Sequence, residues 1–307
     1  HITAITHRKN PIYLTTLVGK PPQEDFYLGK ATERIFLPLM RTQLPEIIDM
    51  NMPAEGVFHN LVIISIEKRF PMQARRLMSA LWGMGQMSFV KTIVVFDHTV
   101  DIQNTSILLD KLFDQIDFTH DLFFSEGILD VLNHASDRAV YGSKLGIDLT
   151  EKIKGEDEFK RTLTNISSLP PLTPENIIKK FTEITSCKII EKTNTHKIAL
   201  ATIDKKIMHQ GLSLIEKFIS DGDFSLITVL IILEGHENIN DSSTVMWKIL
   251  NNIDPKRDIC LFENRIGIDV TCKTGEKNYA QIWPDEITMS NQIIKAVDQK
   301  WKKMFNE

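Results

Sequence analysis

The sequence predicts two related α/β sandwich modules with mostly parallel sheets, on three observations. The chain has 307 residues, about twice the usual length of a single domain. When the chain is shifted by 137 positions, residues 60–121 align with residues 197–258 without a gap. In each copy, short apolar runs alternate with segments of helical periodicity, which is the order of elements found in α/β folds.

The first copy is predicted to contain two strands and two helices. Residues 61–66 and 92–96 are apolar and rich in β-branched side chains, as expected of strands that are buried on both faces. Between them, residues 71–84 begin with proline and carry apolar side chains at helical spacing. A second helix is predicted at residues 104–115, after a polar segment that can cap it.

The second copy repeats this order, with strands predicted at 198–203 and 226–233 and helices at 207–220 and 242–252. After Asp121 the first copy carries an insertion, and then both copies reach Gly-Ile-Asp. The identical pairs include Ile66/Ile203, Lys68/Lys205, Gln73/Gln210, Leu77/Leu214, Gly85/Gly222, Ser106/Ser243, Asp117/Asp254 and Asp121/Asp258. In such sheets we expect Ile63, Val94, Leu200 and Ile231 to be buried.

The boundary between the modules is predicted within residues 151–180. Pro170 and Pro171 break any regular element there, and Thr173-Pro174-Glu175 has the cap-then-proline pattern that begins a helix. Near the far end, residues 287–305 are predicted to form an amphipathic helix. Its apolar stripe consists of Ile293, Ile294, Val297, Trp301 and Met304. This stripe must pack either on its own module or on a neighbouring chain.

The composition argues against several classes of protein. A net charge of −4 provides no broad basic surface for nucleic acid or anionic membranes. No apolar stretch approaches the roughly 20 residues that a transmembrane helix needs. The three cysteines and nine histidines lack the spacing of a disulfide framework or a metal site. The acidic pairs Asp114/Asp117 and Glu156/Asp157 are expected to be solvated surface residues.

The first sixty residues carry motifs that identify a family. Arg8-Lys9-Asn10 is followed by Ile12-Tyr13 and by Gly19-Lys20-Pro21-Pro22-Gln23-Glu24. These motifs, with "FLPLMRTQLPEIID", "MPAEG" and "GSKLGID", resemble the UbiD decarboxylase family (3-octaprenyl-4-hydroxybenzoate carboxy-lyase-like) colinearly over residues 2–150. The later segment "VMWKILNNIDPKRDICLFEN" is also similar to a helix and turn of this family.

The resemblance implies a division of the chain. Residues 1–59 would be the end of an upstream flavin-binding β-barrel domain with a connecting segment, and 60–155 the family's C-terminal α/β module, here named copy A. Residues 156–196 would be a linker and helix, and 197–307 a second related module with the terminal helix, named copy B. Because the chain does not begin with Met and its first residues are predicted as a strand, we expect a portion of a longer protein.

The resemblance also implies an activity. Members of the family catalyse non-oxidative decarboxylation on prenylated FMN, a flavin held with a divalent metal (Mn or Mg) and in some members potassium. The implied substrate is an aromatic carboxylate of the hydroxybenzoate or naphthoate type, a precursor in ubiquinone or menaquinone biosynthesis, and a flavin prenyltransferase would supply the cofactor. A carbanion left by departing carbon dioxide needs an electron sink that side chains do not supply, so a cofactor is expected on chemical grounds as well. The implied location is cytoplasmic, with peripheral association to the membrane as an alternative.

Few site residues are expected in this chain. The family's catalytic residues, metal ligands and most flavin contacts lie upstream, so we expect no catalytic residue and no metal ligand here. Gly19, Lys20, Pro21 and Pro22 are candidates for the wall of the substrate pocket, or else form a stiff surface turn. Ser106 aligns with a flavin-contacting position of the family, or else belongs to a helix cap.

One basic residue and the role of the whole chain remain open at this stage. Lys144 could neutralise an anionic group or merely lie in a solvated loop. The chain is either the carboxy-terminal part of a decarboxylase, completing the pocket and building a dimeric or hexameric homo-oligomer, or a non-catalytic assembly module of decayed decarboxylase ancestry. In both cases we expect the interface to use copy B or residues 287–305, and we expect copy A to fold after truncation near residue 155.

Overall fold

We describe the fold from a computed structural model, which covers residues 1–11, 13, 19–159, 161, 172–191, 195–277 and 279–305, with side chains to residue 301. Ile12, Pro170 and Pro171 lie outside the described residues, as does the side chain of Met304. Residues 1–11 contain no strand, although a strand was expected there.

Copy A contains a five-stranded sheet in the order β1-β2-β3-β5-β4. Its strands are β1 (Ile47–Asn51), β2 (Leu61–Ile66), β3 (Thr92–Asp97), β4 (Leu122–Ile128) and β5 (Tyr141–Asp148). Strands β2, β3 and β5 are parallel neighbours, with Ile63 opposite Val94 and Val94 opposite Ile147. The two edge strands β1 and β4 run antiparallel to their neighbours.

Copy B repeats this sheet in the order β6-β7-β8-β10-β9. Its strands are β6 (Ile184–Ile190), β7 (Lys197–Ile203), β8 (Ile227–Glu234), β9 (Ile259–Phe262) and β10 (Arg265–Asp269). The insertion of copy A lies between β4 and β5, where copy B has only the short hairpin between β9 and β10. The predicted duplication is therefore present in the topology as well as in the sequence.

Parallel pairing is confined to the three inner strands of each sheet, so the sheets are mixed instead of mostly parallel. The cause is the length of the connections. The segments before β2 and β7, residues 52–60 and 191–196, are too short for a crossover helix, so β1 and β6 pair antiparallel. Strands β1 and β6 begin before residues 60 and 197, and they extend each sheet toward the N-terminus of the predicted modules.

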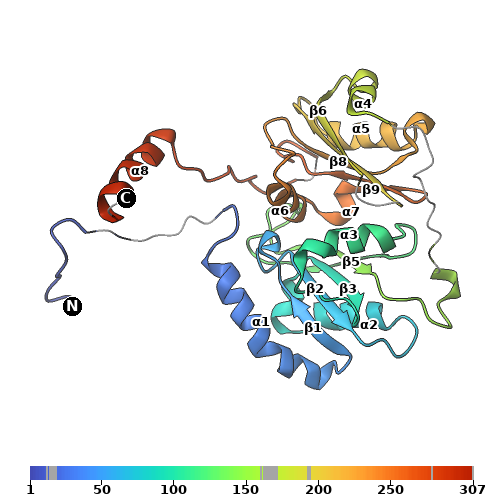
Figure 1. Cartoon of the computed structure of the whole chain (residues 1–307), viewed down its shortest axis with the longest axis horizontal. Coiled ribbons are helices and arrows are strands. Elements are labelled where there is room, and N and C mark those ends of the chain that lie inside the picture. The colour runs from blue at the N-terminus through green and yellow to red at the C-terminus, as the bar shows by residue number, and fades with distance from the viewer. Residues whose placement is uncertain are drawn as a thin grey trace.

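The helices cover the sheets in layers (Figure 1). Helix α1 (Glu24–Gln43) precedes copy A, which contains α2 (Gln73–Trp82) and α3 (Thr105–Gln115). Helix α4 (Pro174–Lys180) precedes copy B, which contains α5 (Gln210–Ile219), α6 (Ser242–Asn252), α7 (Pro255–Asp258) and the terminal α8 (Asn291–Phe305). Helix α2 covers the outer face of the first sheet and α5 the outer face of the second. Helices α3 and α6 lie between the two sheets.

A single apolar core joins the two modules. Ile63 and Val94 of the first sheet and Leu200 and Ile231 of the second belong to one cluster of buried side chains. Each of these four residues is at most 6% exposed, which confirms the expected burial. Leu108 of α3 and the buried side chains of α6 fill the space between the sheets. Helices α3 and α6 therefore shield the inner faces of both sheets from water.

Copy A contains a buried ionic network at the start of α2. Glu156, 1% exposed, accepts hydrogen bonds from Lys68 Nζ at 2.6 Å and from the backbone nitrogen of Met72 at 2.7 Å. Asp117 is also buried, at 2% exposure, and accepts from the backbone nitrogen of Thr119. The expectation that Glu156 and Asp117 are solvated was wrong, because both carboxylates are buried and accept hydrogen bonds from neighbouring N–H groups.

Copy B contains the equivalent network. Glu276 accepts from Lys205 Nζ at 2.5 Å and from the backbone nitrogen of His209 at 2.8 Å. Met72 and His209 occupy matching positions and both have left-handed backbone conformation, with φ of 62° and 56°. Lys68 and Lys205 are identical in the two copies, and each donates a hydrogen bond to the equivalent buried carboxylate of its own module.

Helix α8 lies away from both sheets at the end of an extended segment (Figure 1). Its apolar side chains Ile293, Ile294, Val297 and Trp301 are 45–50% exposed. Within the described part of the chain, no helix combines the length and apolar character needed to cross a membrane.

Candidate functional site

The Gly-Lys-Pro-Pro loop of residues 19–22 lies against copy B. Lys20 Nζ forms an ion pair with Asp241 Oδ2 at 2.9 Å. Asp241 precedes α6 and accepts hydrogen bonds from the backbone and side chain of Thr244. The Thr244 hydroxyl, and after it Lys20, lower the pKa of Asp241 well below its usual range. The loop is therefore fixed at the N-terminus of α6, a helix of the second module.

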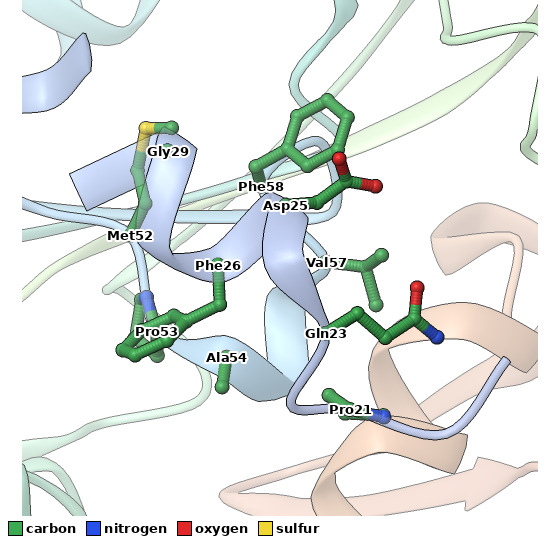
Figure 2. Close-up of a pocket in the computed structure, with 10 residues that line it drawn as sticks. All are labelled: Pro21, Gln23, Asp25, Phe26, Gly29, Met52, Pro53, Ala54, Val57 and Phe58. Carbon is green, nitrogen blue, oxygen red and sulfur yellow. The ribbon is translucent and has the colours of Figure 1, made fainter. Parts of the chain in front are cut away.

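A small pocket joins this loop to the Met52-Pro53-Ala54 turn, which belongs to the "MPAEG" motif (Figure 2). Pro21 comes from the loop, Phe26 and Gly29 from α1, and Pro53 and Ala54 from the turn. The pocket encloses only about 10 Å³. Two motifs that are thirty residues apart in the sequence therefore form one surface, although this surface is too shallow to enclose a ligand.

The turn is held to copy B in the same way as the loop. Ser243 Oγ, in the first turn of α6, donates to Glu55 Oε1 at 2.8 Å. Ser243 is the residue of copy B that aligns with Ser106. The N-terminus of α6 thus contacts both motifs, through Asp241 and Ser243.

Gln23 is a polar residue of the pocket with unmet hydrogen-bonding capacity. It lies next to Pro21 and Val57 (Figure 2). Its amide oxygen and nitrogen are both buried and have no hydrogen-bond partner among the described residues. A buried polar atom without a partner costs about 1–3 kcal/mol, so this amide favours a ligand or a further protein segment that can bond to it.

The structure does not bring Ser106 to this surface. Ser106 is exposed, and its hydroxyl donates to Asn104 Oδ1 at 2.6 Å within the same helix start. This contact is the one expected of a residue near a helix cap. A flavin contact by Ser106 stays a prediction.

Lys144 is buried and does not lie in a solvated loop. It is 1% exposed and donates to the carbonyl oxygens of Ser88 and Val90, each at 2.8 Å. Burial lowers the pKa of this amine to about 8. Lys144 therefore joins β5 to the segment Gly85–Phe89, and no carboxylate accompanies it in the contacts described.

The sequence did not indicate Asp241 and Ser243 as residues of this surface, and it placed Gln23 in the recognised motif without selecting it as a pocket residue. For Ser243 a signal existed, because the repeat aligns it with Ser106. The sequence provided no means of choosing between the two copies. The ion pair of Lys20 and Asp241 joins residues 221 positions apart, which no local pattern reveals.

The small pocket at the Gly-Lys-Pro-Pro loop does not form a flavin site by itself. The pocket encloses about 10 Å³, far less than the several hundred cubic ångströms of a typical cofactor site. Within the described ranges, no cluster of three His, Cys, Asp or Glu residues could hold a metal ion. The residues of this small pocket can supply one wall of such a site, with the Gln23 amide as its polar group, but they cannot enclose the cofactor.

Comparison with known proteins defines the family. The family model of the 3-octaprenyl-4-hydroxybenzoate carboxy-lyase C-terminal domain matches residues 26–149 and 166–282. The chain therefore belongs to the UbiD family, of which it contains the C-terminal domain. The first matched range contains the sheet β1 to β5, and the second contains the sheet β6 to β10.

The relatives are longer than this chain. A Helicobacter pylori protein is 34% identical over 300 residues, which are 97% of this chain and 47% of that protein. An Aquifex aeolicus protein is 46% identical over 177 residues, covering 58% of this chain and 36% of that protein. The chain thus spans about half the length, or less, of these curated relatives.

The chain is also similar to solved UbiD-class enzymes. The vanillic acid decarboxylase of Sedimentibacter hydroxybenzoicus in its open form is 24% identical, with a TM-score of 0.45, and the match covers 58% of this chain and 37% of that one. The UbiD-class enzyme HmfF of Pelotomaculum thermopropionicum in complex with FMN is 23% identical, with a TM-score of 0.38 over 48% of this chain and 33% of that one.

Proposed function

We propose that this chain is the carboxy-terminal part of a decarboxylase that acts on aromatic acids of the hydroxybenzoate or naphthoate type with prenylated FMN. The observation that carries the proposal is that two family motifs, the Gly-Lys-Pro-Pro loop and the "MPAEG" turn, meet around the unpartnered amide of Gln23. We further propose that most cofactor, metal and potassium contacts come from an upstream domain, that a flavin prenyltransferase supplies the cofactor, and that the enzyme works in the cytoplasm.

In the proposed reaction the bond between the ring carbon and the carboxylate breaks, carbon dioxide leaves, and a proton takes its place on carbon. The prenylated flavin supplies the electron sink when it is bound. The residues of this chain would exclude water and orient the substrate. Pro21, Pro53 and Ala54 provide an apolar wall, and the Gln23 amide can bond to a polar group placed against it.

Copy B has a defined part in this proposal. Through Asp241 and Ser243 it fixes the loop and the turn from one helix terminus. The second module would therefore hold the wall of the pocket in position, in addition to contributing to a homo-oligomer through its own surface or through α8.

The alternative is a non-catalytic assembly module, which the exposed apolar stripe of α8 favours. The two functions differ in what the complete gene product can do. A decarboxylase binds prenylated flavin and releases carbon dioxide from an aromatic acid, whereas an assembly module does neither.

The test compares the 307-residue chain with the complete gene product, each co-produced with a flavin prenyltransferase. We expect the chain alone to be colourless and the complete product to be coloured and to decarboxylate at least one hydroxybenzoate or naphthoate. Stoichiometric flavin on the chain alone, or a colourless and inactive complete product, would contradict the proposal.

A matched pair of variants tests the role of Gln23 in the active complete product. Gln23→Leu should lower kcat/KM about tenfold, because it removes one hydrogen bond of about 1 to 1.5 kcal/mol from the pocket wall. Gln299→Leu, on the exposed helix α8, should leave kcat/KM unchanged. Equal values for Gln23→Leu and the unsubstituted protein would remove Gln23 from the site.

A further inference from the structure

A second and larger cavity lies beneath helix α1. It has a volume of about 490 Å³, within the range of small-molecule sites, and is partly open to solvent. One wall is formed by α1 and another by the segment from Met84 to Val90. Met52 and Phe58 line this cavity as well as the small pocket at the Gly-Lys-Pro-Pro loop.

The lining is apolar and adaptable. Five of the chain's eleven methionines line the cavity, namely Met40, Met50, Met52, Met84 and Met87. Methionine has three rotatable bonds and a polarisable sulfur, so such a lining can fit different shapes and packs well against aromatic rings. Apolar side chains thus define the shape of the cavity, and only a few polar groups line it.

The ionisable groups that line the cavity disfavour an anionic ligand. Its ionisable lining residues are Asp25, Glu33, His59 and Asp130, and no lysine or arginine lines it within the described part of the chain. The Glu33 carboxylate is already satisfied by Arg34 at 2.8 Å and by the backbone nitrogen of Met52 at 2.7 Å. Arg34 and Lys30, which is 3.1 Å away, thus compensate the Glu33 charge, whereas a carboxylate or phosphate entering the cavity would meet Asp25 and Asp130 and no lysine or arginine among the described lining residues.

His59 is a buried polar residue of the cavity whose ring is poorly satisfied by the described residues. It is 5% exposed, both ring nitrogens are buried, and no described group makes a well-aligned hydrogen bond to them, although the backbone of Val57 interacts with the ring. Burial lowers the pKa of His59 to about 4, so the imidazole is neutral near pH 7 and offers one N–H donor and one acceptor. A hydroxyl group matches this pair of functions, since it can accept from one nitrogen or donate to the other.

The wall that bears Asp130 is held by copy B. Asp130 lies in the insertion between β4 and β5. Arg257 of copy B donates to Asp137 Oδ1 at 2.6 Å and to the carbonyl oxygen of Ala135 at 2.8 Å, and the Tyr279 hydroxyl donates to the carbonyl oxygen of His134 at 2.8 Å. These contacts fix the insertion, so this side of the cavity has a defined shape before any ligand arrives.

We propose that this cavity binds a neutral, mainly aromatic small molecule with one hydroxyl group, which bonds to His59 once the methionine side chains adjust. The proposed binding of such a molecule is supported by the apolar side chains and the histidine that line the cavity. Its link to the reaction rests on the proposed function, because a hydroxylated aromatic acid that loses its carboxylate becomes a neutral molecule of this class.

The test uses three probes of one shape, 2-naphthol, naphthalene and 2-naphthoate, with the 307-residue chain carrying 13C-labelled methionine methyl groups. We expect 2-naphthol to shift the methyl signals of the five lining methionines and to leave those of Met208, Met246 and Met289 in place. It should bind about fivefold more tightly than naphthalene, which is the gain in affinity expected from one hydrogen bond. The anion 2-naphthoate should bind more weakly than either.

Two variants assign the preference to His59. His59→Phe keeps a ring of similar shape and should abolish the fivefold advantage of 2-naphthol over naphthalene. His236→Phe makes the same chemical change at an exposed position and should preserve it. Because these are binding measurements, they can succeed or fail whether or not the complete protein is a decarboxylase.

Three outcomes would overturn the proposal. The first is equal affinity for 2-naphthol and naphthalene, and the second is methyl shifts spread over the whole chain. The third is binding that appears only after removal of residues 287–307, which would show that helix α8, from the same or a second copy, occupies the cavity instead.

Discussion

Lys91 is the most completely buried cation at the contact between the two modules. It is 1% exposed and donates to Asn133 Oδ1 of the insertion and to the carbonyl oxygens of Asn251 and Ile253 in copy B. Burial lowers the pKa of its amine to about 7, and the carboxylate of Asp254 opposes this shift only in part. The lysine thus joins three segments, and as a cation it donates all three hydrogen bonds, whereas a neutral amine has two N–H groups and can keep only two of them.

This lysine predicts a pH dependence of stability. An unfolded lysine titrates near pH 10.4, so between pH 7 and about pH 10 the unfolded chain binds a proton that the folded chain has lost. The free energy of unfolding should therefore rise with pH in this window, by up to about 1.4 kcal/mol per pH unit. Lys91→Met should lack this contribution, so its deficit relative to the unsubstituted chain should grow between pH 7 and pH 9 in denaturant titrations.

The control for Lys91 is Lys206→Met, an exposed lysine of copy B. Its stability curve should run parallel to that of the unsubstituted chain. A Lys91→Met curve that also ran parallel would mean that the folded lysine keeps its proton up to the ordinary pKa.

At the scale of elements, the buried ionic networks of Glu156 and Glu276 occupy equivalent positions in the two copies. Glu156 and Glu276 each accept from a lysine and from the backbone nitrogen of a residue in left-handed conformation. Burial acts to raise the pKa of both carboxyls, but the hydrogen bonds from Lys68 and Lys205, together with backbone N–H donors and the lysine charges, outweigh it and keep both pKa values below normal. Because the folded carboxyl titrates at a lower pH than the unfolded one, the stabilisation is present near pH 7 and is lost on acidification.

Equivalent substitutions should therefore have equivalent effects. We expect Glu156→Gln and Glu276→Gln each to lower the free energy of unfolding by about 3 kcal/mol at pH 7, because each leaves a buried lysine without its counter-ion. The loss should shrink as the pH approaches 4. Glu151→Gln, at an exposed position, is the matched control and should change stability little. An effect in one copy but not in the other would mean that the two networks are not equivalent.

The predictability of the elements follows their burial. Strands β2, β3, β7 and β8 were predicted because both faces are buried and the sequence there is continuously apolar. Helix α1 was missed, since it contains Pro38 and buries only Glu33 and Met40 completely. The edge strands β1, β4, β6 and β9 were also missed, because their identity depends on pairing with distant neighbours and not on a local pattern.

The site was predictable to a smaller degree than the fold. The Gly-Lys-Pro-Pro loop was recognised from its sequence, and Pro21 does line a pocket. The groups that hold the loop, Asp241 and Ser243, come from the second module, and tertiary packing alone brings them there. The burial of Lys91 and Lys144 could not be foreseen either, because lysine is rarely buried and nothing in their local sequence distinguishes them.

At the scale of the whole molecule, the shared core revises one expectation drawn from the sequence. Copy A was expected to remain folded after truncation near residue 155. In the structure, Ile63, Val94 and Phe96 of copy A belong to the same buried cluster as the inner face of the second sheet. The insertion that follows β4 is held by Arg257 of copy B, and Lys91, which donates to Asn133 of the insertion, also donates to carbonyl oxygens of copy B. Truncation would therefore expose an apolar sheet face and release the insertion.

We accordingly predict that the two modules unfold as one cooperative unit. The intact chain should show a single denaturant transition, with circular dichroism and tryptophan fluorescence coinciding. Residues 1–155 alone should bind a hydrophobic dye and show no cooperative transition, because each inner side chain exposed by the loss of copy B costs about 1.5–3 kcal/mol, against a total stability of about 5–15 kcal/mol.

A second variant, Arg257→Met in the intact chain, tests the contact to the insertion. It should speed the amide exchange of residues 129–140 while both sheets remain folded. A truncated copy A with its own sharp transition, or two separate transitions in the intact chain, would show that the apolar contact between the sheets is dispensable and that each copy of the repeat is a domain by itself.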